Sequence, residues 1–201
     1  MIKSVLLSLM LLLFGCLKIL AQTPFGVKAG PNIAWASGEV DGIDPIIGYH
    51  FGVFSWIKIS ERLKLKPEFV FSEQGFSTSM NSTNTITRIR YIQFPLLLEY
   101  HLDEVIFFAG PQVASIAGAQ YLVKRQDDTE KIPASRDLNN IEYSGVVGIG
   151  VPIQDDLALQ LRYQMSFSHM FDSTFDTFFI SVPETKIRNQ SLQLSITYTI
   201  P

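Results

Sequence analysis

The chain has almost no cysteine: of its 201 residues, only Cys16 carries a thiol. Cys16 lies in an N-terminal stretch with a positive charge at Lys3, an apolar run over residues 5–14 and a small-residue pattern that ends at Ala21. These are the parts of a secretory signal peptide, with cleavage expected after Ala21. The expected mature chain therefore has no thiol, which excludes a disulfide, a cysteine nucleophile and a cysteine-based zinc site.

An excess of positive charge is also lacking. The formal net charge is −3, and loss of Lys3 and Lys18 with the signal peptide would make it −5. A mildly acidic chain has no electrostatic basis for binding nucleic acid, so no nucleic-acid partner is predicted. A Pro/Gly/Ser-rich linker is absent as well, so residues 22–201 are expected to form one domain.

Two other interpretations of the N-terminal stretch stay open. It could be a retained transmembrane anchor, although the run is short and Lys18 interrupts it. It could also be a lipoprotein signal ending at Cys16, although bulky Phe14 stands where such signals prefer a small residue. Because the apolar stretch continues past Cys16 to the better cleavage site, we assign residues 1–21 to a signal peptide.

Strict alternation is present near the C-terminus. Residues 157–168 and residues 191–200 each place apolar side chains at every second position, with Gln, Ser, Thr and Arg162 between them. A period of two indicates a β-strand that separates two unlike environments. Because an export signal precedes these strands, one environment is expected to be lipid.

Eight segments in all have the composition of strands, and few helical stretches compete with them. They are residues 25–34, 45–59, 62–75, 88–102, 105–118, 141–153, 157–170 and 188–200. Tight polar turns at residues 60–61, 103–104 and 154–156 alternate with long loops at residues 35–44, 76–87, 119–140 and 171–187. This plan predicts an all-β fold, an eight-stranded antiparallel up-and-down transmembrane β-barrel in the outer membrane, with both termini in the periplasm.

Alternation alone does not decide which face points inward, because a soluble lipocalin-like barrel has its apolar side inside. Glycines at positions 26, 30, 48, 52, 110, 148 and 150 lie on the polar face, which suits a narrow, crowded lumen. On the apolar face, Tyr143 and Phe167 lie near the loop end, and Tyr100 and Tyr198 lie near the turn end. Two aromatic girdles are typical of a membrane barrel, so outer-membrane lipid is the expected partner of the apolar face.

Parity along the strands predicts the residues of the lumen. Charged residues of both signs are expected to point inward, and the candidate polar network is Lys28, Glu68, Glu99, Glu142 and Arg162. Further inward positions are Asn32, Lys64, Lys66, Gln74, Gln93, Gln160 and Gln164, with Lys64 and Lys66 near the periplasmic rim. An eight-stranded barrel is only wide enough to be filled by its own side chains, so these groups are expected to pair with one another and with water.

Residues 91–100 carry a family resemblance. They consist of Tyr91, an apolar run, Pro95-Leu96-Leu97-Leu98 and a closing Tyr100, which resembles the signature strand of the PorT-like outer-membrane β-barrel family. Residues 25–32 are similar to the first strand of that family, and residues 66–76 are similar to its third strand. The resemblance covers essentially the whole mature chain.

The resemblance implies little about the task of the protein. The namesake of the family is linked to secretion and maturation of exported proteins, whereas most members are known only as barrels, and a shared fold does not carry a shared function. Pro95 is expected to have a structural role, because a proline within a strand gives up a ladder hydrogen bond and usually marks a bulge or kink.

An enzyme is not predicted. The local candidates for catalysis are Ser166, Ser168 and His169, as in outer-membrane enzymes that modify lipid A with His and Ser. Both serines have the opposite parity to His169, so neither is expected to share a proton with it, and Asp172 would also have to approach. His50 and His101 stand alone, so hydrogen bonds are expected rather than metal ligation, and no cofactor is predicted.

The predicted outer loops are the best candidates for function. Residues 171–180 are unusually aromatic for a solvated loop, and Phe171, Phe175, Phe178 and Phe179 are the candidate contacts for a protein partner. The alternative is that this loop extends its hairpin or folds over the barrel mouth. Residues 124–131 have mixed charge and are expected to be an ordinary solvated loop tip.

Together these features predict a monomeric, non-enzymatic outer-membrane barrel that is a structural or interaction component, with a role accessory to protein secretion. The first alternative is a narrow pore for a small solute or ion. The second is a lipid-modifying enzyme.

Overall fold

The computed structural model describes residues 24–38, 42–80, 83–125, 128–133, 138–170 and 187–200. The described strands are β1 (Phe25–Ser37), β2 (Ile43–Ser55), β3 (Ile57–Lys58), β4 (Leu63–Met80), β5 (Thr83–Leu102), β6 (Val105–Arg125), β7 (Asp128–Pro133), β8 (Ile141–Gln154), β9 (Leu157–Ser166) and β10 (Arg188–Ile200). Within these ranges, no helix has the length and apolar character needed to cross a membrane. The predicted signal peptide, residues 1–21, and the aromatic loop, residues 171–180, lie outside the described residues.

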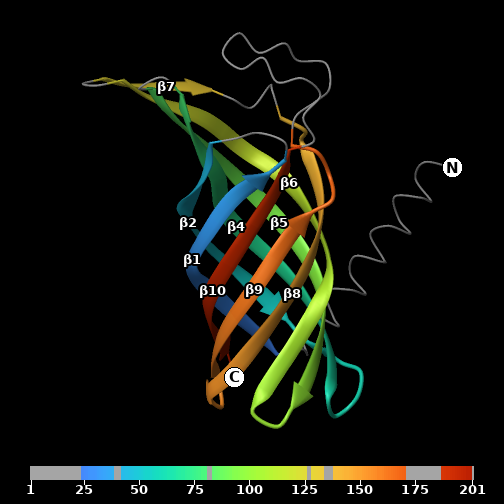
Figure 1. The fold of residues 1–201 in the computed structure, drawn as a ribbon. Helices are drawn as coiled ribbons and strands as arrows, with labels where there is room; N and C mark the ends of the chain where they lie inside the picture. The colour runs from blue at the N-terminus through green and yellow to red at the C-terminus, as the bar shows by residue number, and fades with distance from the viewer. Residues whose placement is uncertain are drawn as a thin grey trace, which may run out of the picture.

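Eight of these strands form a closed antiparallel barrel. Their order around the barrel is β2-β1-β10-β9-β8-β6-β5-β4, and β4 pairs with β2 to close the sheet. The short strand β3 pairs with the start of β4, and β7 pairs with the end of β6 outside the closed ring. In Figure 1 the C-terminus lies at the same end as the short β5–β6 and β8–β9 turns, and β7 lies at the opposite end. The predicted eight-stranded barrel is confirmed.

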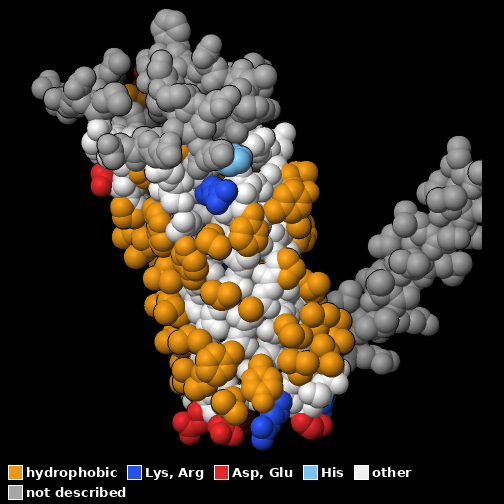
Figure 2. Space-filling model, turned by 45° about the vertical axis from the view of Figure 1, so that its right-hand side comes forward, with side chains coloured by type: hydrophobic (Ala, Val, Ile, Leu, Met, Phe, Trp, Pro, Cys, Tyr) orange, Lys and Arg blue, Asp and Glu red, His pale blue; other side chains and the backbone are white. Residues whose placement is uncertain are grey.

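Burial along each strand follows the alternation of the sequence. In β10, for example, polar residues such as Ser191, Gln193 and Ser195 are buried, whereas Leu192, Leu194 and Ile196 are exposed. The same inversion holds around the barrel, and Figure 2 shows a broad apolar belt with charged side chains gathered below its lower edge. The apolar face therefore points outward, as a membrane barrel requires.

Two connections at the loop end differ from the prediction. Residues 76–87 were expected to form a long loop, but β4 and β5 continue as a paired hairpin up to Met80 and Thr83. Residues 119–140 were also expected to be a loop, but β6 continues to Arg125 and pairs with β7. Backbone pairing extends these hairpins past the closed ring, although residues 77–80 and 83–86 are mostly polar and lack the alternation of a half-buried strand.

The bulge that the sequence suggests at Pro95 is absent. Pro95 lies opposite Gln112, and the β5–β6 register is the same on both sides of this pair. The register shift between these strands lies instead between Arg90 and Tyr91. The β5–β6 register is kept across Pro95, although the next pair after it is Leu98 with Ala109.

Candidate functional site

The interior of the barrel holds a cluster of buried charges, centred on Glu68 of β4. Its carboxylate lies 3.1 Å from the Lys28 Nζ of β1 and 2.8 Å from the Arg162 Nη1 of β9. The side chains of all three residues are at most 1% exposed. A strand on one side of the barrel is therefore joined to a strand on the other by charge-assisted hydrogen bonds.

Lys66 extends this cluster toward the turn end. Its Nζ lies 3.6 Å from Glu68 Oε1 and 2.8 Å from Glu99 Oε1 on β5. The second oxygen of Glu99 accepts a hydrogen bond from the Trp56 indole at 2.8 Å, and the Lys66 Nζ lies 4.2 Å from the centroid of the Phe54 ring. Each charge thus has an opposite charge or an aromatic face beside it, which offsets the cost of burial.

A layer of amides and hydroxyls connects this cluster to Glu142 on β8. Arg162 Nε donates to Gln193 at 2.7 Å, Gln193 donates to Gln164 at 3.3 Å, and Gln164 donates to Glu142 at 3.1 Å. The structure therefore brings all five residues of the predicted network, Lys28, Glu68, Glu99, Glu142 and Arg162, into one connected set of contacts inside the barrel. Glu142 accepts hydrogen bonds from the uncharged side chains of Gln164 and Asn189, so these contacts join it to the others through amides and not through an ion pair.

The inward positions that parity predicted are buried, with one exception. Asn32, Lys66, Gln74, Gln93, Gln160 and Gln164 are at most 3% exposed. Lys64 is half-buried, with its Nζ 5.3 Å from the Trp56 ring, because it lies at the end of the barrel where β4 begins. Lys66, expected near the same rim, lies two residues further along β4, and its side chain is fully buried.

Apolar residues also occupy the lumen, at the loop end and beside the charged cluster, a feature that the expectation of a polar lumen missed. One cluster, the loop-end plug, consists of Ala36, Phe76, Ile89, Tyr91, Ala114, Leu138, Met170 and Ile187. A second cluster consists of Leu97, Ile106, Phe108 and Val146. In both clusters, the residues that belong to strands have inward parity. Apolar residues at inward positions were therefore the sequence signal that could have predicted these clusters. Leu138, Met170 and Ile187 belong to connections, where parity has no predictive value.

The remaining candidates for chemistry contact a backbone group or a single side chain. Ser166 donates to the carbonyl of Ser168 at 3.2 Å, and Ser168 accepts from the Tyr143 backbone at 2.8 Å. His50 lies 2.7 Å from the Ser195 hydroxyl, and His101 Nε2 lies 3.5 Å from Glu99. Within the described ranges, His, Asp and Glu side chains nowhere gather in a group of three able to hold a metal ion.

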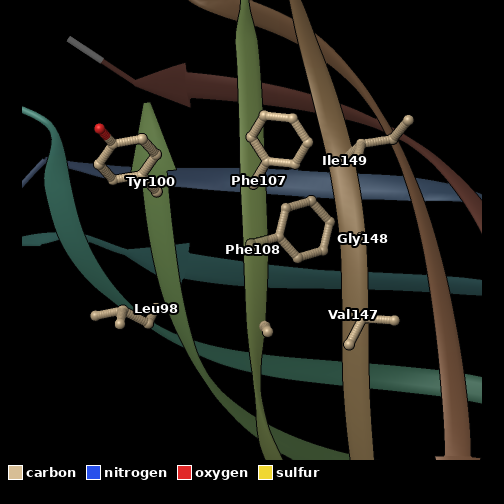
Figure 3. Close-up of a pocket in the computed structure, with 8 residues that line it drawn as sticks. Leu98, Tyr100, Phe107, Phe108, Val147, Gly148 and Ile149 are labelled. Carbon is tan, nitrogen blue, oxygen red and sulfur yellow. The ribbon is translucent and has the colours of Figure 1, made fainter. Parts of the chain in front are cut away.

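Open depressions occur on the outer, apolar face. Figure 3 shows one of them, lined by Leu98 and Tyr100 of β5, Phe107 of β6, and Val147 and Ile149 of β8. These five side chains are exposed on the lipid-facing surface. Because the lining is apolar and faces lipid, the depression suits an acyl chain rather than a polar substrate.

The comparisons with known proteins agree with this architecture. A family model described as outer membrane protein beta-barrel domain matches residues 21–172. Neisserial surface protein A is similar in structure, with a TM-score of 0.54 and 12% identity, over 88% of this chain and 97% of that one. No curated protein sequence matches at a significant level.

Ail, the attachment invasion locus protein of Yersinia pestis, is also similar in structure. Its complex with the heparin analogue sucrose octasulfate has a TM-score of 0.51 and 8% identity, over 89% of this chain and 99% of that one. At these identities the likeness concerns the fold.

Proposed function

Because this chain belongs to the outer membrane protein beta-barrel domain family, we propose that it is a closed, non-conducting barrel of the PorT-like type. In this role it holds binding segments at its loop end and is accessory to protein secretion. The observation that carries the proposal is the filled interior: buried charged and polar side chains and two buried apolar clusters occupy the lumen. A barrel built in this way acts through its ends rather than through its lumen.

The packing of the lumen supports a closed barrel over a pore. Lys28, Lys66 and Arg162 are tied to Glu68 and Glu99 across the barrel, and none of these side chains is more than 1% exposed. A permeating ion would have to break these pairs, and a buried charge that loses its partner is costly. The loop-end plug adds an apolar barrier above them.

The arrangement of the serines supports a non-enzymatic role. Ser166 and Ser168 are hydrogen-bonded to backbone groups rather than to the His169 ring. A nucleophile needs a base within hydrogen-bond reach. Both serines have the opposite strand parity to His169, which is why the sequence predicted that they would not contact its ring. Asp172 lies outside the described residues.

We place the turn end and both termini in the periplasm and the loop end outside the cell. Short turns lie at the periplasmic end of outer-membrane barrels. The turns at residues 103–104 and 155–156 are short and charged, and they lie at the same end as the C-terminus (Figure 1). The chain is proposed to be a monomer, because the closed ring of eight strands leaves no sheet edge within the barrel to pair with a second copy.

The candidate partner segment is the aromatic loop, residues 171–180, with Phe171, Phe175, Phe178 and Phe179. This loop lies outside the described residues. Its assignment as the partner segment is supported by its sequence and by the position of the residues that flank it. Met170 and Ile187, which bracket this region, are hydrogen-bonded to each other at 2.9 Å and belong to the loop-end plug.

The test is affinity purification after crosslinking in native outer membranes, with single-channel conductance recorded on the same preparation. Stoichiometric partners and a silent bilayer are expected. Replacement of residues 171–180 by Gly/Ser should remove the partners, whereas the same replacement at residues 81–82, the tip of the β4–β5 hairpin, should not. Discrete conductance steps would favour the pore, and partners that survive the loop replacement would exclude residues 171–180 as the binding segment.

A further inference from the structure

Charged side chains are rare on the outer face of the described barrel strands, and two of them lie close together. Arg88 and Arg90 point outward from β5 near the loop end, while Ile89 and Tyr91, their neighbours along the strand, point inward. Alternate residues of a strand are about 7 Å apart, so the two guanidinium groups can contact one ligand group.

A single carboxylate lies beside this pair. Glu73 of β4 is directly opposite Arg90, and its carboxylate contacts Arg88 Nη1 and lies 3.7 Å from Arg90 Nε. The Glu73 side chain is 10% exposed, whereas those of Arg88 and Arg90 are 30% and 47% exposed. One buried carboxylate between two exposed guanidinium groups leaves an excess of one positive charge on the surface.

There is space for a ligand next to Arg90. On its other side lies Gly118 of β6, at which an added side-chain carbon would meet no atom within 4 Å. The β5–β6 register shifts between Arg90 and Tyr91, which marks a bulge at this level. The bulge and the glycine together leave an open place on the outer surface beside the guanidinium group.

Apolar surface continues from this place toward the turn end. The next outward residues of β5 are Ile92 and Phe94, and Phe94 packs edge-on against Phe69 of β4 with ring centroids 5.3 Å apart. Phe94 is 50% exposed and Phe69 is 47% exposed. A molecule that fits both the arginine pair and this apolar surface carries an anionic head group at the loop end and hydrocarbon toward the turn end.

We propose that Arg88 and Arg90 bind the phosphate of a phosphorylated lipid in the leaflet at the loop end, with Gly118 making room for the head group. Guanidinium groups bind phosphate through two parallel hydrogen bonds, which makes paired arginines suited to this ligand. The apolar surface below them then receives the acyl chains. Glu73 orients both arginines and competes with the phosphate for them.

Native mass spectrometry of the purified full chain in maltoside micelles, which contain no phosphate, tests the proposal. The probes are a bis-phosphorylated lipid A and its phosphate-free form with the same acyl chains. The wild type is expected to retain the phosphorylated lipid preferentially. R88Q and R90Q should each weaken retention about tenfold, since hydrogen bonds to charged groups are the strong ones.

Two variants separate binding from folding. E73Q should strengthen retention of the phosphorylated lipid, because it removes the competing carboxylate, whereas a damaged barrel would retain less. R188Q, at an exposed arginine at the start of β10, is the matched control and should leave retention unchanged.

Equal retention of the two lipids, or an equal loss in R188Q, would overturn the proposal. Displacement of the lipid by millimolar inorganic phosphate would show a site for free phosphate instead of a lipid, and would also overturn it. The lipid site rests on the proposed function in one respect: the proposed orientation of the barrel decides in which leaflet the lipid is bound. Because micelles have no leaflets, a wrong orientation would leave the result of this test unchanged.

Discussion

At the scale of single residues, the interior depends on a few side chains that have no substitute. Glu68 lies within 4 Å of three cations, Lys28, Lys66 and Arg162, and all four side chains are buried. A cluster of this kind adds little net stability when complete, but loss of one member leaves the others without a partner in a medium of low polarity. We infer that its role is to hold a unique arrangement of strands around the lumen.

We expect E68Q to lower the free energy of unfolding by about 3–5 kcal/mol, because it leaves buried cations without their shared carboxylate. Urea unfolding in lipid vesicles, followed by tryptophan fluorescence, measures this change. E61Q is the control. Glu61 pairs with Lys58 in the exposed turn region, and this pairing lowers the pKa of the Glu61 carboxyl through a hydrogen bond, yet both side chains are in solvent. No measurable change is expected for E61Q.

Two glycines make a second matched pair. Gly75 has a φ of +146°, and an added side-chain carbon would lie 1.9 Å from the Thr87 carbonyl oxygen, whereas the same addition at Gly118 meets open space. G75A is therefore expected to lower the free energy of unfolding by at least about 1–3 kcal/mol through backbone strain, and G118A should be tolerated. The fraction of heat-modifiable, folded barrel on unheated gels measures both, and equal yields of the two variants would contradict the explanation.

At the scale of elements, turn chemistry sets the register of the hairpins. The β5–β6 hairpin closes with two residues, Asp103 and Glu104, between the paired residues Leu102 and Val105. Asp103 has a φ of 49°, in the left-handed region that Asp tolerates better than most residues. The sequence placed this turn correctly, because a polar pair between two alternating segments is a strong turn signal.

D103V is expected to destabilise the barrel by about 1–2 kcal/mol, because a β-branched residue is strained in the left-handed region, whereas D103G should be neutral or stabilising. Refolding yield into vesicles and the midpoint of urea unfolding report the effect. D155V, in the β8–β9 turn, supplies the comparison, since Asp155 is not in the left-handed region. A loss of stability in D103G as large as that in D103V would show that the side chain of Asp103, and not its backbone conformation, matters.

The loop-end hairpins show where prediction by element fails. Residues 77–80 and 83–86 were expected to be loop but pair as strand, as do residues 120–125 with β7. None of these segments alternates apolar with polar residues, so pairing with a neighbouring strand decides their conformation. The opposite error occurs in β9, which was expected to reach residue 170 but ends at Ser166.

At the scale of the whole molecule, the closed barrel defines two ends that experiment can distinguish. The expected mature chain has no cysteine, so single cysteines can be introduced without interference. In S79C, at the loop end, a membrane-impermeant maleimide should label intact cells, because the loop end is proposed to lie outside. In S60C, at the turn end, labelling should require permeabilised cells. Both serines are exposed, so the reverse pattern would invert the proposed topology.

The sequence by itself determined the number of barrel strands, the face that each strand turns to lipid and the inward position of the buried charges. The strands follow from a local period of two, and the face turned to lipid follows from the glycines on one face and the aromatic residues on the other. Only the tertiary structure decided which inward residues meet: that Lys28, Glu68 and Arg162 share one cluster, that Lys66 joins Glu68 to Glu99, and that an apolar plug closes the loop end. These contacts join strands on different sides of the barrel, so they depend on the stagger of the strands and the closure of the sheet, neither of which has a local signature in the sequence.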